Sequence, residues 1–213
     1  MIIAIASDRS LAGAYNANIV KRLFQEVAKD REAGVETMVI CIGRQIAQAA
    51  TRVQGLHVVA VYQDFPDHPD ADQLRPILNT AIERFIVHDV DAVDLLYTYF
   101  YSTIRQELRL QRILPAGFSE VEVPPEITRA VVEPSINELV QATAIRLIEV
   151  QLFQAVLEAV ASEHSMRMLA MKNATDNASE LIEDYTLEYN NARQAAITQE
   201  LAEISAGAEA LNG

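Results

Sequence analysis

The side chain with the clearest potential for chemistry between chains is Arg193. No carboxylate lies three or four residues away from it, and no basic residue follows it in the sequence. Its neighbours at those spacings are Tyr189, Asn190, Ala196 and Ile197. A guanidinium without a local partner suits a carboxylate on another chain, where two parallel hydrogen bonds add specificity. A solvated arginine explains the same spacing equally well, so the residues alone leave both interpretations open.

Three other basic residues of the C-terminal region have acidic neighbours at helical spacing. The expected pairs are Arg146 with Glu149, Arg167 with Glu163, and Lys172 with Asp176. Side chains three or four residues apart meet on a helix surface, and each such pair contributes about 0.2–0.5 kcal/mol. These pairs predict an ordinary solvated helix surface, on which Arg193 is the exception.

The loop from Ser7 to Gly13 follows an apolar segment and precedes a helical one, where phosphate-binding loops lie in α/β proteins. It has one glycine and no Lys-Ser or Lys-Thr pair, so it matches neither the P-loop nor the dinucleotide fingerprint. The histidines show no metal-ligand spacing. The sequence also lacks the nucleophile-elbow motif that would support a hydrolase triad. We therefore expect no catalytic residue, no metal site and no cofactor.

A very long helix must position the C-terminal residues, because residues 135–206 contain no proline or glycine and many good helix formers. Ser135 and Glu138 match a capping box at its start. Apolar side chains recur at steps of about three and four residues, the stripe that packs on another helix: Leu139, Ile145, Ile148, Leu152, Val156, Val160, Met168, Met171, Leu181, Tyr185 and Tyr189. Such a helix is on the order of 105 Å long. We expect its first turns to dock on its own domain and other chains to cover the rest.

Residues 1–125 alternate apolar and amphipathic segments, which predicts an α/β domain with a largely parallel sheet. Strands are expected at 2–6, 35–42, 58–62, 93–101 and 103–114. The first helix is expected to end at Gly34, and two further helices are expected to cover 44–53 and 72–87. Asn16 or Asn18 is expected to cap the first helix, and Asp72 the third. An acidic, proline-bearing linker at 126–134 separates this domain from a C-terminal helix of residues 135–213.

Composition limits the classes of function. A net charge of −13 argues against nucleic acid, which is bound through clustered Lys and Arg. No segment approaches the roughly 18 apolar residues of a membrane-spanning helix. The segment 1–6 has no basic region before it, so it is read as a strand rather than a signal peptide. Cys41 is the only cysteine and lies in an apolar run, which predicts a buried thiol.

Two segments of the long helix carry a resemblance to a known family. Residues 171–178 (Met-Lys-Asn-Ala-Thr-Asp-Asn-Ala) and 189–201 (Tyr-Asn-Asn-Ala-Arg-Gln-Ala-Ala-Ile-Thr-Gln-Glu-Leu) resemble the C-terminal helix of the gamma subunit of F-type ATP synthase. Residues 6–18 resemble that family's first strand and the loop after it. The resemblance implies a small Rossmann-like α/β domain with a mainly parallel sheet, followed by one very long C-terminal α-helix that is half of a coiled coil. Because Met1 starts directly on the first strand, we expect a gamma subunit lacking the N-terminal shaft helix.

The resemblance also implies a function. It indicates a non-catalytic central-stalk subunit, the rotor shaft that couples proton flow through the membrane rotor to ATP synthesis in the alpha-beta hexamer. The implied partners are the alpha, beta and epsilon subunits and the membrane c-ring. The implied location is the cytoplasmic face of the plasma membrane, reached only through partner proteins. Arg193, Gln194 and Thr198 match positions that contact the catalytic beta subunits, and Glu133 resembles a position near the membrane ring.

Two other interpretations compete with this one. The first is a small-molecule-binding α/β protein with a helical oligomerisation arm, which would need a polar pocket at the carboxyl ends of the sheet strands. The second is a coiled-coil scaffold unrelated to ATP synthesis. Co-purification with a hexameric ATPase separates the scaffold from the rotor shaft.

Overall fold

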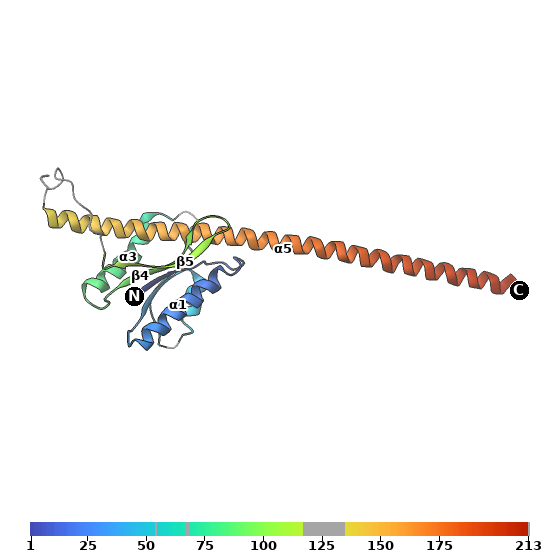
Figure 1. Ribbon diagram of the computed structural model, residues 1–213, viewed down its shortest axis with the longest axis horizontal. Coiled ribbons are helices and arrows are strands. Elements are labelled where there is room, and N and C mark those ends of the chain that lie inside the picture. Colours follow the sequence, from blue (N-terminus) through green and yellow to red (C-terminus); the bar gives the residue numbers. More distant parts are fainter. Residues whose placement is uncertain (54, 67–68, 117–134, 213) are drawn as a thin grey trace. The chain divides into compact units, whose positions relative to one another are not determined.

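The computed structural model describes residues 1–53, 55–66, 69–116 and 135–212. Its elements follow the alternation expected from the sequence and end in one long helix (Figure 1). They are β1 (Ile2–Ile5), α1 (Tyr15–Glu32), β2 (Met38–Ile42), α2 (Arg44–Ala50), β3 (His57–Tyr62), α3 (Ala71–Ile86), β4 (Val93–Phe100), β5 (Gln106–Leu114) and α5 (Ile136–Asn212). The fold class is therefore confirmed: α/β, with a very long C-terminal helix.

The five strands form one sheet in the order β3-β2-β1-β4-β5. The pairs β1–β2, β1–β4 and β2–β3 are parallel, and β5 runs antiparallel to β4. The central strand β1 is buried along its whole length, which explains why its sequence is continuously apolar rather than alternating. The sheet is thus mainly parallel, and its one antiparallel strand is the hairpin partner expected after residue 103.

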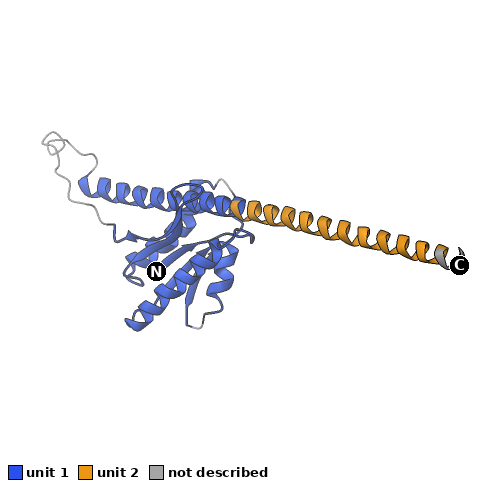
Figure 2. Cartoon of the chain, turned by 45° about the vertical axis from the view of Figure 1, so that its right-hand side comes forward, with its two compact units in different colours: residues 1–168 blue, residues 169–213 orange. Residues whose placement is uncertain are grey.

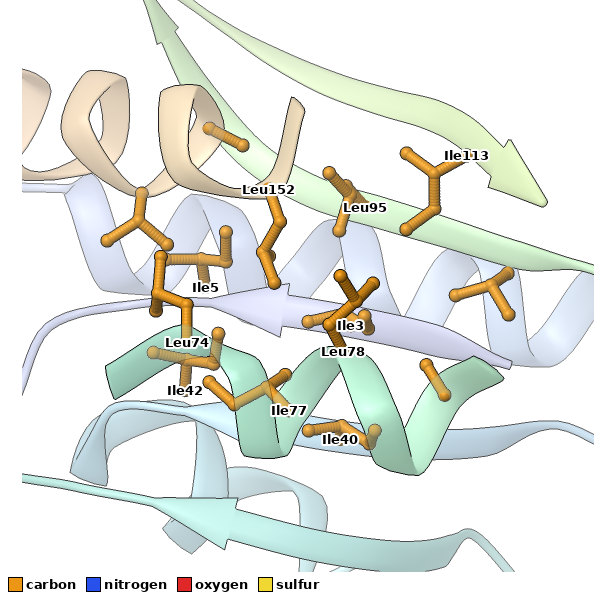
Figure 3. Close-up of a cluster of buried hydrophobic side chains, with 14 of the residues drawn as sticks. Ile3, Ile5, Ile40, Ile42, Leu74, Ile77, Leu78, Leu95, Ile113 and Leu152 are labelled. Carbon is orange, nitrogen blue, oxygen red and sulfur yellow. The ribbon is translucent and has the colours of Figure 1, made fainter. Parts of the chain in front are cut away.

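Helices cover both faces of the sheet. The helices α1 and α2 pack on one face through a cluster that includes Ile19, Leu23 and Ile46. On the other face, α3 and the first part of α5 share a second cluster (Figures 1 and 3). Figure 3 labels Leu74, Ile77 and Leu78 of α3 and Leu152 of α5 beside Ile3, Ile5, Ile40, Ile42, Leu95 and Ile113 of the strands.

By its internal contacts the chain divides into two compact units, residues 1–168 and 169–213 (Figure 2). The first 33 positions of α5 belong to the first unit because Ile148, Leu152 and Val156 are buried in its core. In the second unit every large apolar side chain that the structure describes is exposed, as Leu181 is at 54%. The expected linker at 126–134 lies outside the described residues, so the boundaries at 125 and 135 stay predictions.

Two helix caps differ from the expected ones. Helix α1 begins after Ala14, and Asn16 lies inside its first turn, where its side chain bonds to Ser7 instead of capping the helix. Helix α3 begins after Asp70, whose carboxylate accepts from the backbone N–H of Asp72. The side chain of Gln73 in turn accepts from the N–H of Asp70, which completes a capping box. At the start of α5 the Ser135 hydroxyl oxygen accepts from the N–H of Glu138 at 3.2 Å, which is one of the two hydrogen bonds of the expected capping box.

Candidate functional site

The loop after β1, where a phosphate would bind in many α/β proteins, is occupied by the chain's own side chains. The N–H of Ser7 donates to the Asn16 side chain at 3.1 Å. The N–H of Arg44, at the start of α2, donates to the Asp8 carboxylate at 2.9 Å. Both backbone donors are therefore satisfied internally, and the negative charge of Asp8 already occupies the place that an anion would take.

The carboxyl edge of the sheet is also tightly closed. Gly43 has a φ of 101°, and a Cβ atom there would lie 2.1 Å from the carbonyl oxygen of Ala6. The cavity at this edge measures about 70 Å³ and is lined by residues that include Tyr15, Glu163 and Arg167. Cavities that bind small organic ligands measure about 300–1,000 Å³. This cavity therefore offers room for a few waters and not for a nucleotide.

Two buried hydrogen bonds attach α5 to the α/β domain within the first unit. The hydroxyl of Tyr15 donates to the carbonyl oxygen of Ala159 at 3.2 Å, and that of Ser162 donates to the carbonyl oxygen of Thr98 at 3.1 Å. Burial raises the pKa of Tyr15, with a smaller contribution from Glu163, so the hydroxyl keeps its proton. Since Ser162 is fully buried, its hydroxyl has no alternative partner in water.

Two of the three ion pairs expected along α5 are present. Arg146 contacts Glu149 at 2.9 Å, and Arg167 contacts Glu163. Lys172 and Asp176 do not form the third pair in the part of the chain that the structure describes. The prediction of a solvated helix surface with local ion pairs is therefore largely confirmed. Lys172 is solvated rather than paired with Asp176.

The residues assigned to partner contacts lie on exposed turns of the second unit. Arg193 makes no hydrogen bond or ion pair with any described residue, as its sequence neighbours predict. Gln194 and Thr198 lie one turn apart, and the Thr198 hydroxyl donates to the Gln194 carbonyl oxygen at 2.8 Å. Glu133 lies outside the described residues. The structure thus groups three of the four assigned residues on one exposed helix segment, and their contact with a partner stays a prediction.

Sequence reasoning missed one group of side chains on the hairpin of β4 and β5. Tyr99, Tyr101, Arg105 and Arg109, together with Glu107, contact one another there, and we call this group the Tyr–Arg cluster. Alternating tyrosines along β4 predict an aromatic face. The missing signal is the register of the hairpin, which brings Arg109 of β5, and Arg105 just before it, onto the same face.

The described residues contain neither a cluster suited to a metal ion nor a helix suited to crossing a membrane. No three His, Cys, Asp or Glu side chains among the described residues lie close enough together to hold a metal ion. No described helix combines the length and the apolar character that crossing a bilayer requires.

Known proteins share both the sequence and the fold. Residues 1–211 match the family described as ATP synthase. The ATP synthase gamma chain of Moorella thermoacetica is 39% identical over 209 residues, which cover 98% of this chain and 72% of that protein. The corresponding chain of Neisseria gonorrhoeae is 37% identical over 213 residues, covering 98% and 73%.

Solved structures show the same fold at lower identity. A chain of the Euglena gracilis mitochondrial ATP synthase, from a structure of its OSCP, F1 and c-ring, aligns with a TM-score of 0.69 at 21% identity. That alignment covers 99% of this chain and 72% of the other. A chain of the Tetrahymena thermophila central stalk and c-ring aligns at 0.65 and 19% identity, covering 82% and 75%.

These findings confirm the resemblance seen in the long helix and the expectation of a central-stalk subunit of ATP synthase. They do not favour the small-molecule-binding alternative, and the cavity of about 70 Å³ at the carboxyl edge of the sheet gives that alternative no support. The chain belongs to the ATP synthase family, among its gamma chains.

Proposed function

We propose that this chain is the rotor shaft of an F-type ATP synthase and that it couples proton flow through a membrane rotor to ATP synthesis in an alpha-beta hexamer. The observation that carries the proposal is the second unit, a helix whose large apolar side chains are exposed. Residues 169–212 alone extend about 66 Å at the standard helical rise. Because apolar surface of this extent is costly in water, other chains must cover it.

A shaft can change the nucleotide affinity of its neighbours only if it contacts them differently in different orientations. In the second unit apolar and acidic side chains alternate along and around the helix, such as Leu181 and Tyr185 beside Glu183 and Glu188. Rotation of the helix therefore presents different side chains in turn to each surrounding subunit.

We propose further that the chain has no active site of its own and that nucleotide and its metal ion bind to the neighbouring subunits. The closed edge of the sheet, with its cavity of about 70 Å³, supports this. The proposed partners are the alpha, beta and epsilon subunits and the c-ring, and the proposed location is the cytoplasmic face of the membrane. The net charge of −13 supports protein partners rather than nucleic acid.

Within this assembly, Arg193, Gln194 and Thr198 contact the catalytic beta subunits, and Glu133 lies near the membrane ring. The free guanidinium of Arg193 supports the first assignment, since its donors have no partner among the described residues. Arg193→Ala should lower the ATP hydrolysis rate or the assembly of a reconstituted complex by roughly tenfold or more, because losing one partner of a buried interfacial charge pair costs about 2–5 kcal/mol.

The matched control is Arg22→Ala on α1, which removes an arginine that pairs with Glu26 within the chain. Equal hydrolysis and assembly for both variants would remove Arg193 from the contact. The wider proposal is tested by affinity purification of the tagged full chain from its host. Recovery without a hexameric ATPase would instead favour the coiled-coil scaffold.

A further inference from the structure

The Tyr–Arg cluster lies on the β4–β5 hairpin and has no part in the proposed rotor mechanism. Tyr99 pairs with Glu107 in the register of the two strands, and the next pair on the same face is Tyr97 with Arg109. Because side chains alternate along a strand, Tyr99, Tyr101 and Arg109 all lie on one side of the hairpin. The strand register thus fixes Tyr99, Glu107 and Arg109, and the turn of the hairpin places Tyr101 and Arg105 beside them.

Arg109 is held from two sides. The carbon centre of its guanidinium lies 3.4 Å from the ring centroid of Tyr99, and its Nη2 atom donates to the Tyr101 hydroxyl at 2.7 Å. The two tyrosine rings lie 4.5 Å apart between centroids. A guanidinium stacked and bonded in this way has already lost much of its rotational freedom, so the entropic cost of ordering it when a partner binds is smaller.

The arginines beside Arg109 make a useful comparison. Arg105 donates through Nε and Nη2 to Glu107, at 3.1 and 2.7 Å, and Arg112 donates through the same two atoms to Asp94, at 2.9 and 3.0 Å. Arg109 has no carboxylate within ion-pair distance in the part of the chain that the structure describes. A further side-chain hydrogen bond joins Arg109 to Tyr97, and its remaining N–H donors are available to a carboxylate from outside.

The surface around Arg109 has the composition of a protein-binding site. Ile104 at the tip of the hairpin is 92% exposed and Tyr101 is 44% exposed. Tyrosine and arginine are the residues most enriched where protein interfaces gain their binding energy. An exposed isoleucine beside them provides an apolar anchor next to the free donors.

We infer that the Tyr–Arg cluster docks a segment of another protein chain that carries a carboxylate next to apolar side chains. The carboxylate pairs with Arg109, and the apolar side chains contact Ile104 and Tyr101. Charge complementarity identifies the occupant: among the described residues Arg109 has Glu107 within electrostatic reach but no carboxylate within ion-pair distance, and the net charge of −13 repels the phosphates of nucleic acid. The inference rests on the proposed function, because the occupant is a neighbouring subunit of the same complex.

The test is photo-crosslinking in the intact complex. A benzophenone amino acid replaces Thr103, an exposed hairpin residue outside the cluster, and a second preparation carries it at Ala195 in the helix of the second unit. Mass spectrometry identifies the crosslinked peptides. We expect the Thr103 position to give a product with another subunit, through a peptide that contains Asp or Glu.

Arg109→Gln should lower the yield of that product roughly tenfold or more, as expected for loss of one partner of a charge pair. Arg109→Lys, which keeps the charge but not the stacked plane, should give an intermediate yield. Arg22→Gln, which removes an equal charge elsewhere, should leave the yield unchanged. Circular dichroism of each purified variant checks that its fold is intact.

Several results would overturn the inference. The first is that the Thr103 position gives no product while the Ala195 position does. The second is that the Thr103 product contains a peptide without carboxylates, a lipid or a second copy of this chain. The third is that Arg109→Gln gives the same yield as the parent. Loss of products at both positions would count against the proposed assembly itself, and the docking surface would fail with it.

Discussion

Residues 136–168 and 169–208 belong to the same helix, α5, but they differ in what covers their apolar side chains. In the first stretch Leu152 is fully buried between the sheet and α3, whereas in the second Leu181 is 54% exposed. Both leucines belong to the same apolar stripe in the sequence. Helical periodicity therefore identifies which side of a helix is apolar, but it does not identify the chain that will cover that side.

The same contrast holds for polar side chains. The Ser162 hydroxyl in the first stretch is buried and bonded to β4, while the Thr198 hydroxyl in the second is exposed and bonded to its own helix. The first stretch is thus stabilised by its own domain. The second gains no tertiary contact from the residues of its own unit, so its stability depends on helix propensity and on partners.

The largest difference in the free energy of unfolding is expected when one glycine is replaced in each unit. Gly43→Ala should destabilise the full chain by about 2–6 kcal/mol, because a Cβ there would meet a carbonyl oxygen and its backbone conformation is nearly confined to glycine. Gly207→Ala meets no atom within 4 Å and should stabilise the helix by about 0.5–1 kcal/mol. Denaturant unfolding followed by tyrosine fluorescence measures the first, and helicity by circular dichroism the second. A stable Gly43→Ala variant would contradict the close approach of β1 and α2.

A smaller effect is expected from shortening a leucine in each stretch. Leu152→Ala should cost about 2–5 kcal/mol, since it leaves a cavity in a well-packed core. Leu181→Ala should change the unfolding free energy of the isolated chain by less than about 0.5 kcal/mol, because an exposed leucine loses little on truncation. Equal costs for the two variants in denaturant titrations would mean that the second stretch is covered within the chain.

The polar pair gives a smaller difference again. Ser162→Ala should cost about 1–3 kcal/mol, because the carbonyl oxygen of Thr98 loses its donor in a buried place. Thr198→Ala should be neutral within about 0.5 kcal/mol, since it removes an exposed hydroxyl and places a better helix former there. Thermal unfolding of the two variants under identical conditions measures the difference. A Ser162→Ala variant as stable as the parent would show that water replaces the hydroxyl.

Most of the fold follows from the sequence, and the two helix caps that were predicted wrongly have identifiable physical causes. The strands and helices were predictable because their apolar patterns agree with the local propensities. The α1 cap was not, because Asn16 bonds to Ser7, a contact that depends on how the loop folds over β1. The α3 cap had a signal in the sequence, the capping box of Asp70 and Gln73, which identifies Asp70 in place of Asp72.

The candidate sites divide in the same way. The free guanidinium of Arg193 was predictable, because a helix fixes which residues can reach it. The Tyr–Arg cluster was not, because its geometry depends on the register of β4 and β5. That register shifts between Val93 and Asp94, and alternation within one strand cannot reveal such a shift.

The last comparison uses thiol chemistry. Burial raises the pKa of Cys41 from 9.0 to about 11 and removes the thiol from solvent. We therefore expect Cys41 to react with a thiol reagent only when the first unit unfolds, whereas a cysteine introduced by Ala195→Cys in the exposed helix should react at once. Between pH 9 and about 11 the Cys41 thiol keeps its proton in the folded state and loses it in the unfolded state. The free energy of unfolding should therefore fall as the pH rises through this range. At pH 10 the loss should be about 1 kcal/mol relative to Cys41→Ala, measured by denaturant unfolding. Rapid labelling of Cys41 in the folded chain would show that the first unit opens more readily than its burial implies, and would weaken its contrast with the second.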